Sequence, residues 1–202
     1  VSPLLWHFMS RYQRVRISSV ILQSPSVRRL TCENRWISQI LTGRSQFNSR
    51  HWERDEGYHL IRSKYAIATG GVTGKGFAVG PFLKYNFLPE RHNDFIFAAI
   101  AHQWGFIGCC VIIFLYCVIF ISGVEIAINN TDPFGRLLAI GIITMFTVEV
   151  LVNISMTLGL MPITGLTLPL VSYGGSSLLV SMIGIGLLNN VGRCRQFTVA
   201  GR

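Results

Sequence analysis

The sequence places several ionisable side chains directly in front of a long apolar segment. The motif NFLPERHNDF puts Glu90, Arg91, His92 and Asp94 ahead of an apolar run that begins at Phe95. A carboxylate at the lip of a hydrophobic helix loses hydration, which should raise the pKa of Asp94 above its reference of about 3.9. Such a carboxylate is a candidate general base, a role that typically contributes roughly 10²–10⁴-fold in rate. A cap for the helix that starts at Phe95 is the alternative role of Asp94, and the two roles are compatible.

A glycine-rich segment with one lysine is the second candidate for chemistry. The motif GGVTGKGF carries Lys75 between Gly74 and Gly76. It is not a Walker A loop, because Thr69 stands where that motif needs its first glycine and Gly76 stands where it needs Ser or Thr. Successive backbone N–H groups beside an ammonium can still cradle an anion. A flexible turn with one exposed lysine is the competing interpretation.

A group of hydroxyl-bearing and small residues forms the third candidate. The motif LPLVSYGGSS lies between the helix-breaking Pro169 and an apolar segment. Non-helical backbone at membrane depth survives only inside protein or beside a cavity, so this segment is expected to line a polar cavity. A tight helix contact through small residues is an equal alternative. The candidate binding residues in this motif are Ser172, Tyr173, Gly174, Gly175 and Ser176.

Two polar side chains share one face of a second apolar segment. Glu149 and Asn153 are four residues apart, so they face the same side of a helix. An ionisable residue within a membrane span is a functional candidate by default. A satisfied hydrogen bond between helices is the simpler interpretation of this pair.

These candidates lie among segments long enough and apolar enough to cross a membrane. Half of the 202 residues are hydrophobic and only 13% are charged, whereas a soluble domain carries about 25% charged residues. About 20 apolar residues in a helix cross the hydrocarbon core of a bilayer. The pattern predicts three complete membrane helices near residues 95–124, 137–160 and 176–192, and Asp132 with Pro133 signals the start of the second. The fold class is therefore an all-α polytopic membrane helical bundle.

The chain divides into parts of different composition. Residues 1–94 hold 14 of the 18 Lys/Arg residues, which suggests anionic partners such as lipid headgroups or a pyrophosphate, while no motif supports nucleic acid. A stretch at 18–56 has no clear period and is expected to be poorly ordered, and a short amphipathic helix is expected at 57–68. The chain is expected to begin with the end of a truncated membrane helix and a basic edge at 1–17. A large irregular external loop at 18–94 follows, with a candidate insertion at 18–56. A three-helix membrane region at 95–192 and a tail at 193–202 complete the chain.

The orientation of these helices follows from the charge of the C-terminal tail. Short basic segments that follow a span favour the cytoplasm, so the tail at 193–202 is expected there. The segments then alternate across the membrane. Asp94 and the loop at 161–175 are expected on the external side, and the turn at 125–136 is expected in the cytoplasm.

Four long motifs follow one another in the order PLLWHFMSRYQRVRI, GYHLIRSKYAIATGGVTGKGF, FLPERHNDFIFAAIA and NISMTLGLMPITGLTLPLVSYGGSS. In this order they resemble the SEDS family of cell-wall polymerases, which includes RodA, FtsW and SpoVE. The resemblance covers residues 2–17 and most of 57–193. It is nearest to the C-terminal part of the rod-elongation branch, RodA.

The resemblance implies a roughly ten-helix enzyme of the bacterial cytoplasmic (inner) membrane. That enzyme is a peptidoglycan glycosyltransferase, which polymerises lipid II into glycan strands during cell elongation and shape maintenance. Its implied ligands are lipid II and polyprenyl pyrophosphate, and its implied partner is a class B penicillin-binding protein. Asp94 matches the proposed catalytic base of the family, a divalent metal such as Mg²⁺ is a candidate cofactor, and no organic cofactor is expected. The further residues expected to bind substrate are Lys64, Lys75, Glu90, Arg91 and His92, with Arg62 also available to offset charge.

The chain departs from the family pattern at three places. Residues 18–56 stand where the family has a shorter connection, His102 and Gln103 stand where it usually has two acidic residues, and Arg62 stands where the elongation branch has Gln. A lipid II flippase and an inactive truncated or divergent scaffold are therefore alternative functions. The external carboxylate favours the enzyme, since a transporter needs charges at the membrane midplane and Glu149 is the only one.

Overall fold

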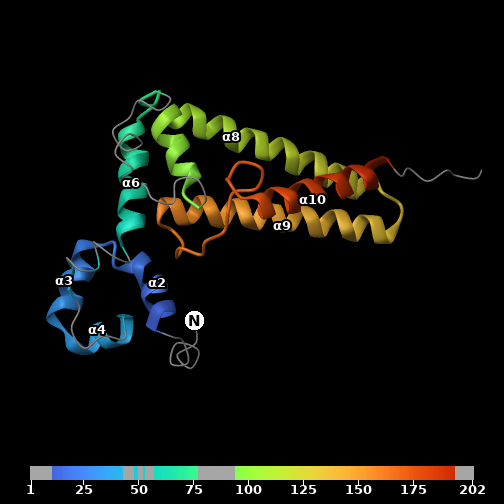
Figure 1. The fold of residues 1–202 in the computed structure, drawn as a ribbon. Coiled ribbons are helices and arrows are strands. Elements are labelled where there is room, and N and C mark those ends of the chain that lie inside the picture. The colour runs from blue at the N-terminus through green and yellow to red at the C-terminus, as the bar shows by residue number, and fades with distance from the viewer. Residues whose placement is uncertain (1–10, 43–47, 50–51, 53–56, 77–93, 194–202) are drawn as a thin grey trace, which may run out of the picture.

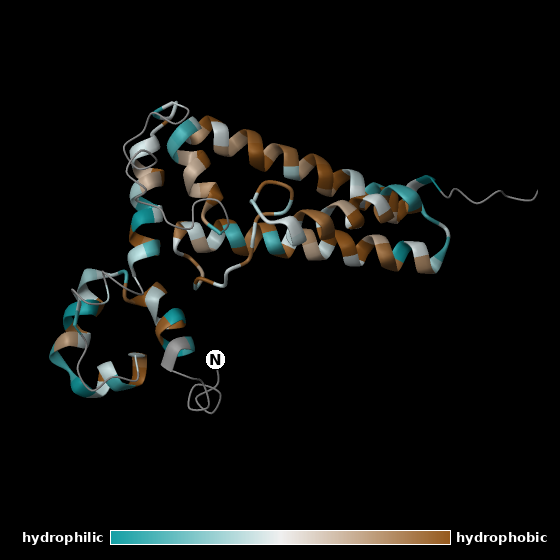
Figure 2. Ribbon diagram, viewed as in Figure 1, coloured by the Kyte–Doolittle hydropathy of each residue, from teal (hydrophilic) through white to brown (hydrophobic). Residues whose placement is uncertain are grey.

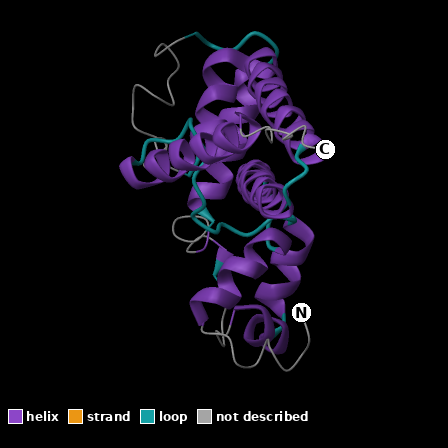
Figure 3. Ribbon diagram, turned by 90° about the vertical axis from the view of Figure 1, so that its right-hand side faces the viewer, coloured by secondary structure: helices purple, strands orange, loops and turns teal. Residues whose placement is uncertain are grey.

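The computed structural model describes residues 11–42, 48–49, 52, 57–76 and 94–193. All regular structure in these residues is helical, as Figure 3 shows. The helices, labelled in Figure 1, are α2 (Arg11–Ile21), α3 (Pro25–Glu33), α4 (Arg35–Thr42), α6 (Tyr58–Gly70), α8 (Ile96–Asn129), α9 (Pro133–Leu158) and α10 (Gly175–Arg193). The expected all-α class is confirmed.

Three of these helices, α8, α9 and α10, are long and apolar enough to cross a membrane. Figure 2 shows hydrophobic residues around much of their surface. Large apolar side chains such as Phe114 and Ile121 are about two-thirds exposed, which is expected where lipid surrounds a helix on its outer face. Three membrane helices are confirmed, and α8 ends at Asn129, five residues later than expected. The extra turn packs Ala127 into a cluster with α9 and α10, and that burial stabilises it.

The helices α8 and α9 lie antiparallel, side by side along the bundle (Figure 1). Their connection is three residues long because α9 starts at Pro133 with Asp132 as its N-cap. The Asp132 carboxylate accepts a hydrogen bond of 2.8 Å from the Gly135 N–H. An acceptor at the N-cap and a proline in the first turn both stabilise a helix start, so the predicted start signal is confirmed.

The helix α9 ends in a left-handed glycine, and a non-helical loop of residues 159–174 follows. Gly159 has φ of 78°, and its N–H bonds to carbonyls of the last helical turn, as in many helix ends. The loop folds back on the bundle, where Leu168 is fully buried in a cluster with Tyr116 of α8 and Val150 of α9. The Tyr116 hydroxyl donates to the carbonyl of Pro169. The loop is therefore fixed to both long helices.

The expectation of an irregular, poorly ordered segment at 18–56 is wrong for residues 18–42. These residues complete α2 and form α3 and α4. A small core joins this part, since Val15, Leu22 and Trp52 are buried together. Few apolar residues carry this core, and hydroxyls such as those of Ser18 and Thr31 bond to carbonyls of their own helices. The helices α3 and α4 are nevertheless amphipathic, and this pattern was missed in the sequence because each helix is only nine or eight residues long.

The helix α6 confirms the expected short helix near 57–68 and ends at the glycines that follow it. Figure 1 shows α6 crossing the ends of the long helices instead of running along them. It packs against both α8 and α9. Ser63 is buried, and its hydroxyl donates a bond of 2.8 Å to the carbonyl of Thr157 at the end of α9. The helix thus covers the end of the bundle at which α8 begins.

The expected orientation leads to a labelling prediction. We expect a cysteine at Thr73, in the exposed turn after α6, to react with a membrane-impermeant maleimide added to intact spheroplasts. A cysteine at Thr131, in the turn between α8 and α9, should react only after permeabilisation. Mass spectrometry of the two peptides separates them from the native cysteines. Labelling of Thr131→Cys alone in intact cells would reverse the orientation.

Candidate active site at the start of α8

Asp94 lies directly before α8, where three other parts of the chain meet. The next residue, Phe95, is only 2% exposed and packs in a cluster with Ala66 of α6 and Ala98 of α8. Ile163 of the 159–174 loop packs against the same cluster. The loop, α6 and the first turn of α8 therefore surround the position of Asp94, whose side chain is partly buried.

An aromatic contact brings one more titratable side chain to this place. The ring of His59, on α6, stacks on the ring of Phe95 with 6.1 Å between ring centroids and 16° between their planes. His59 was not among the candidates from sequence, because a histidine at the start of an amphipathic helix carries no signal of a distant partner. Its position beside Phe95 makes it a neighbour of the Asp94 region.

The helix-cap interpretation of Asp94 does not match the geometry. The N-cap position of α8 is Phe95, with φ of −104° and ψ of 25° and no side-chain cap hydrogen bond. Asp94 lies one residue outside that position. Its Oδ2 atom faces the 159–174 loop, because a Cβ atom placed on Gly165 would lie 3.6 Å from it. The carboxylate thus sits beside a residue that has no side chain to cover it.

Asn153 connects the two sides of this site from within α9. Its Nδ2 donates to the carbonyl of Asp94 at 3.0 Å and to the carbonyl of Leu166 at 2.6 Å. The side chain is completely buried. A satisfied hydrogen bond between helices was the simpler interpretation of Asn153 from sequence, but both of its acceptors lie outside helices, and its partner Asp94 was not foreseen. Glu149, one turn earlier on α9, is half-buried.

The first turns of α8 are separated from the rest of the helix by a break at Gly105. This residue has φ of 67° and ψ of −160°, which is not helical, and Figure 1 shows the short first part of α8 at a steep angle to the long second part. The break frees N–H groups, and two of them are bonded by the turn after α6. Phe106 donates to the carbonyl of Gly71 at 2.9 Å, and Ile107 donates to that of Val72 at 3.2 Å.

The same turn also donates to the first part of α8. The N–H of Lys75 bonds to the carbonyl of His102 at 3.0 Å, and that of Gly76 bonds to the carbonyl of Gln103 at 3.1 Å. The N–H of Gly74 bonds within the turn, to Gly70. The expectation that these N–H groups form an anion-binding nest is therefore wrong, because backbone carbonyls already accept from them. The turn at 70–76 instead acts as a backbone clamp on the break, and only the exposed side chain of Lys75 remains available to an anion.

His102 has a structural place in this clamp. Its side chain is 1% exposed, and its Nδ1 lies 3.0 Å from the hydroxyl of Thr69 at the end of α6. The sequence resemblance implies an acidic residue at this position, and in this chain a histidine makes a polar contact there. Gln103 is half-buried, and its backbone carbonyl accepts the hydrogen bond from the N–H of Gly76.

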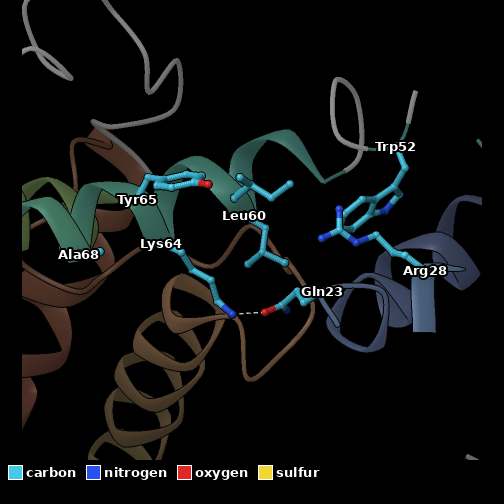
Figure 4. A pocket seen from close by; sticks show the side chains of 8 residues that line it. Gln23, Arg28, Trp52, Leu60, Lys64, Tyr65 and Ala68 are labelled. Atoms are coloured by element: carbon cyan, nitrogen blue, oxygen red, sulfur yellow. Dashed lines mark hydrogen bonds between the residues drawn. The ribbon is translucent and has the colours of Figure 1, made fainter. Parts of the chain in front are cut away.

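Lys64 lies at a pocket between α6 and the α2–α3 region. Its ammonium donates to Gln23 Oε1, and the Nε2 of Gln23 donates to the carbonyl of Gly159 at 2.8 Å. Figure 4 shows these residues at the pocket, a cavity of about 280 Å³. Arg28 lies over the ring of Trp52 on its other side. The structure thus links Lys64 to the end of α9, and its role in substrate binding stays a prediction.

The residues of the LPLVSYGGSS motif are spread over different environments. Ser172 is buried, and its Oγ accepts from the N–H of Leu168 at 2.7 Å. Tyr173 is 81% exposed. Gly174 precedes α10, and Gly175 and Ser176 form its first, exposed turn. The motif therefore closes the 159–174 loop and starts α10, and its contact with substrate stays a prediction.

Three expected site residues, Glu90, Arg91 and His92, lie outside the described residues. The metal expectation depends partly on them. Among the residues that the structure describes, no group of three or more His, Cys, Asp or Glu side chains could hold a metal ion. The described residues therefore offer no cluster that would hold a divalent metal without ligands from elsewhere, and the metal stays a prediction.

The fold and the site together define a class of protein. It is a polytopic α-helical membrane protein with a carboxylate at the end of one span, held against a non-helical loop between two others. Residues 4–196 match the family model FTSW_RODA_SPOVE, described as cell cycle protein. The chain therefore belongs to the FtsW/RodA/SpoVE family.

Curated relatives agree with this membership. The chain is 45% identical over 135 residues to peptidoglycan glycosyltransferase MrdB of Escherichia coli K12, covering 67% of this chain and 36% of that protein. It is 44% identical over 135 residues to peptidoglycan glycosyltransferase RodA of Treponema pallidum, covering 67% and 31%. Stage V sporulation protein E of Bacillus subtilis is 41% identical over 141 residues, covering 70% and 38%. The chain thus spans about a third of the length of these relatives.

Solved structures show the same fold. A chain of a peptidoglycan synthase complex, described as coordinating polymerization and crosslinking, matches with a TM-score of 0.57 and 35% identity over 68% of this chain and 37% of that one. The rod shape determining protein RodA of Thermus thermophilus, solved as an aspartate-to-alanine variant, matches with a TM-score of 0.50 and 29% identity over 83% and 56%.

Proposed function

We propose that the chain forms the part of a peptidoglycan glycosyltransferase that carries its general base, Asp94. The single observation that carries this proposal is the position of the Asp94 carboxylate. It lies at the end of a membrane-length helix and faces Gly165 of a non-helical loop. A partly desolvated carboxylate of this kind is suited to accept a proton from a hydroxyl group.

The proposed reaction extends a glycan strand with lipid II as substrate. The 4-hydroxyl oxygen of the acceptor sugar attacks the anomeric carbon of the donor sugar, and a new C–O bond forms. The bond between that carbon and the pyrophosphate oxygen breaks, and polyprenyl pyrophosphate leaves with the electron pair. Asp94 takes the proton of the attacking hydroxyl, so charge and atoms balance.

Cationic side chains on α6 and on the turn that follows it are candidates to offset the charge of the leaving pyrophosphate. Lys75 is exposed on the turn that clamps α8. Arg62, on α6, lies over the ring of Tyr58 at 4.7 Å from the ring centroid, a contact that orients its guanidinium. Arg91 is a further candidate from the sequence.

The setting of the enzyme follows from its relatives. The chain is a membrane protein, and we place it in the bacterial inner membrane, where lipid II is available on the external face. A class B penicillin-binding protein is the proposed partner, because one solved relative belongs to a peptidoglycan synthase complex that couples polymerization to crosslinking. The matched relatives named MrdB and RodA favour a role in cell elongation.

The test uses what we call the complemented assembly. This is the full 202-residue chain co-produced with the part of E. coli MrdB that the chain does not match, and the MrdB part alone serves as the blank. Purified in detergent with labelled lipid II, the assembly should form glycan strands that a muramidase digests.

Detergent removes the bilayer, so a flippase would give no product in this assay. Transport of labelled lipid II in liposomes without any polymer in detergent would contradict the proposed function and support the flippase. Absence of both activities in folded assembly would support the scaffold.

A further inference from the structure

We propose that Asn153 is a positioning residue, which holds Asp94 at a fixed place relative to the 159–174 loop. This inference rests on the proposed role of Asp94 as the base. The carboxylate belongs to a residue just outside α8, and the loop wall that it faces is non-helical. Neither segment is part of a regular helix, so helical hydrogen bonds do not fix its backbone. The position of each segment therefore depends on contacts with other parts of the chain.

The two hydrogen bonds of Asn153 join those two segments through one side chain. An asparagine amide nitrogen has two N–H groups, and in Asn153 one is directed at the carbonyl of Asp94 and the other at the carbonyl of Leu166. Leu166 directly follows Gly165, the residue beside the Asp94 carboxylate. The Asn153 amide therefore sets the distance between the backbone of Asp94 and the 159–174 loop that its carboxylate faces.

The choice of asparagine is not explained by packing alone. Asn153 is completely buried in α9 near apolar neighbours such as Val150 and Met156. Its Oδ1 is buried, and none of the residues that the structure describes donates a hydrogen bond to it. A buried acceptor without a donor lowers stability. An apolar side chain would avoid that cost, but the carbonyls of Asp94 and Leu166 would lose their hydrogen bonds from this position.

A second buried hydrogen bond provides a comparison within the same region. The hydroxyl of Ser63 on α6 donates to the carbonyl of Thr157, one turn beyond Asn153 on α9. This bond also joins two elements at the end of the bundle, and Ser63 is as deeply buried as Asn153. It does not bond to Asp94 or to the loop. Loss of this bond should therefore weaken the fold without moving the base.

The effect of Asn153 on the reaction would come through geometry. A displacement of about 1 Å between a base and its substrate can reduce a rate by about 10²-fold. Substrate binding uses many other contacts, so a shift of the base should lower kcat and leave KM for lipid II nearly unchanged.

The first test compares Asn153→Ala, Asn153→Leu and Ser63→Ala in the complemented assembly. We expect both Asn153 variants to lower kcat per folded protein at least about 10-fold, with KM within about 2-fold. The leucine variant keeps the branched shape and the number of non-hydrogen atoms of the side chain and leaves no cavity, so it guards against a simple folding defect. Ser63→Ala should lower the melting temperature and keep kcat within about 2-fold of the wild type. Wild-type kcat in Asn153→Leu, or an equal loss in Ser63→Ala, would overturn the proposal.

The second test needs no enzymatic activity. Dicyclohexylcarbodiimide modifies carboxyl groups near apolar surfaces, and peptide mass spectrometry on the full chain in detergent measures its rate at Asp94. We expect at least about a 3-fold change of this rate in both Asn153 variants and none in Ser63→Ala, because Asn153 bonds to the Asp94 backbone whereas Ser63 bonds to Thr157. Equal rates in all variants would overturn the positioning role. If the wild-type assembly forms no glycan, the proposed function fails, while this rate still decides the role of Asn153.

Discussion

Gly105→Ala is expected to disrupt the start of α8 and to abolish the folded site. Gly105 combines a φ of 67° with a ψ of −160°, a region that is essentially reserved for glycine and costs other residues about 1–3 kcal/mol. An added Cβ would also meet the backbone of the clamp, at 2.5 Å from the carbonyl oxygen of Val72 and even closer to the N–H of Gly74. The clamp must then open, and the bonds of Phe106 and Ile107 to it are lost.

A second glycine separates the two causes of this loss. Gly71 has nearly the same conformation, with φ of 61° and ψ of −148°, but a Cβ there would have no neighbour within 4 Å. Gly71→Ala should therefore show only the conformational cost of about 1–3 kcal/mol. Gly105→Ala should lose clearly more, measured as the melting temperature and the folded fraction in detergent.

A third glycine gives the baseline for this comparison. Gly141 lies within α9 and is exposed, and a Cβ there would also be free of contacts. Gly141→Ala should leave stability unchanged or raise it by roughly 1 kcal/mol, since alanine favours a helix. If Gly105→Ala were as stable as Gly71→Ala, the clamp would not hold the break in α8.

Much of the membrane region could be predicted from composition and length. The three spans follow from uninterrupted apolar residues, and the start of α9 follows from Asp132 and Pro133. These features are local, so the sequence displays them directly. The same holds for the end of α6, where successive glycines cannot continue a helix. The break at Gly105 was missed, because an isolated glycine within an apolar helix is usually tolerated.

The arrangement of the site depended on contacts between distant segments. Asp94 and Asn153 are 59 residues apart, and nothing in their local sequence predicts their hydrogen bond. For the GGVTGKG segment, composition left open an anion nest or a flexible turn, but the N–H groups of Lys75 and Gly76 bond to the broken helix. The helices α3 and α4 were missed for a different reason. Both are amphipathic, but they are only nine and eight residues long, and the residues that they bury, such as Thr31 and Thr42, are polar.

The most direct test of the account is the replacement of Asp94 itself. Asp94→Asn keeps the size of the side chain and leaves the backbone carbonyl that Asn153 binds, but it removes the basicity. Because a positioned base contributes roughly 10²–10⁴-fold in rate, glycan formation should fall at least about 10²-fold. The folded amount should stay near that of the wild type, since Asp94 is not the N-cap of α8.

The measurement is the rate of glycan-strand formation from labelled lipid II by the complemented assembly in detergent, divided by the amount of folded assembly. The matched control is Asp132→Asn, which changes a carboxylate at the opposite end of α8 and keeps an accepting side chain at the N-cap of α9. That control should retain the wild-type rate. The account predicts near-zero polymerisation by folded Asp94→Asn, and polymerisation by Asp94→Asn at the rate of Asp132→Asn would contradict it.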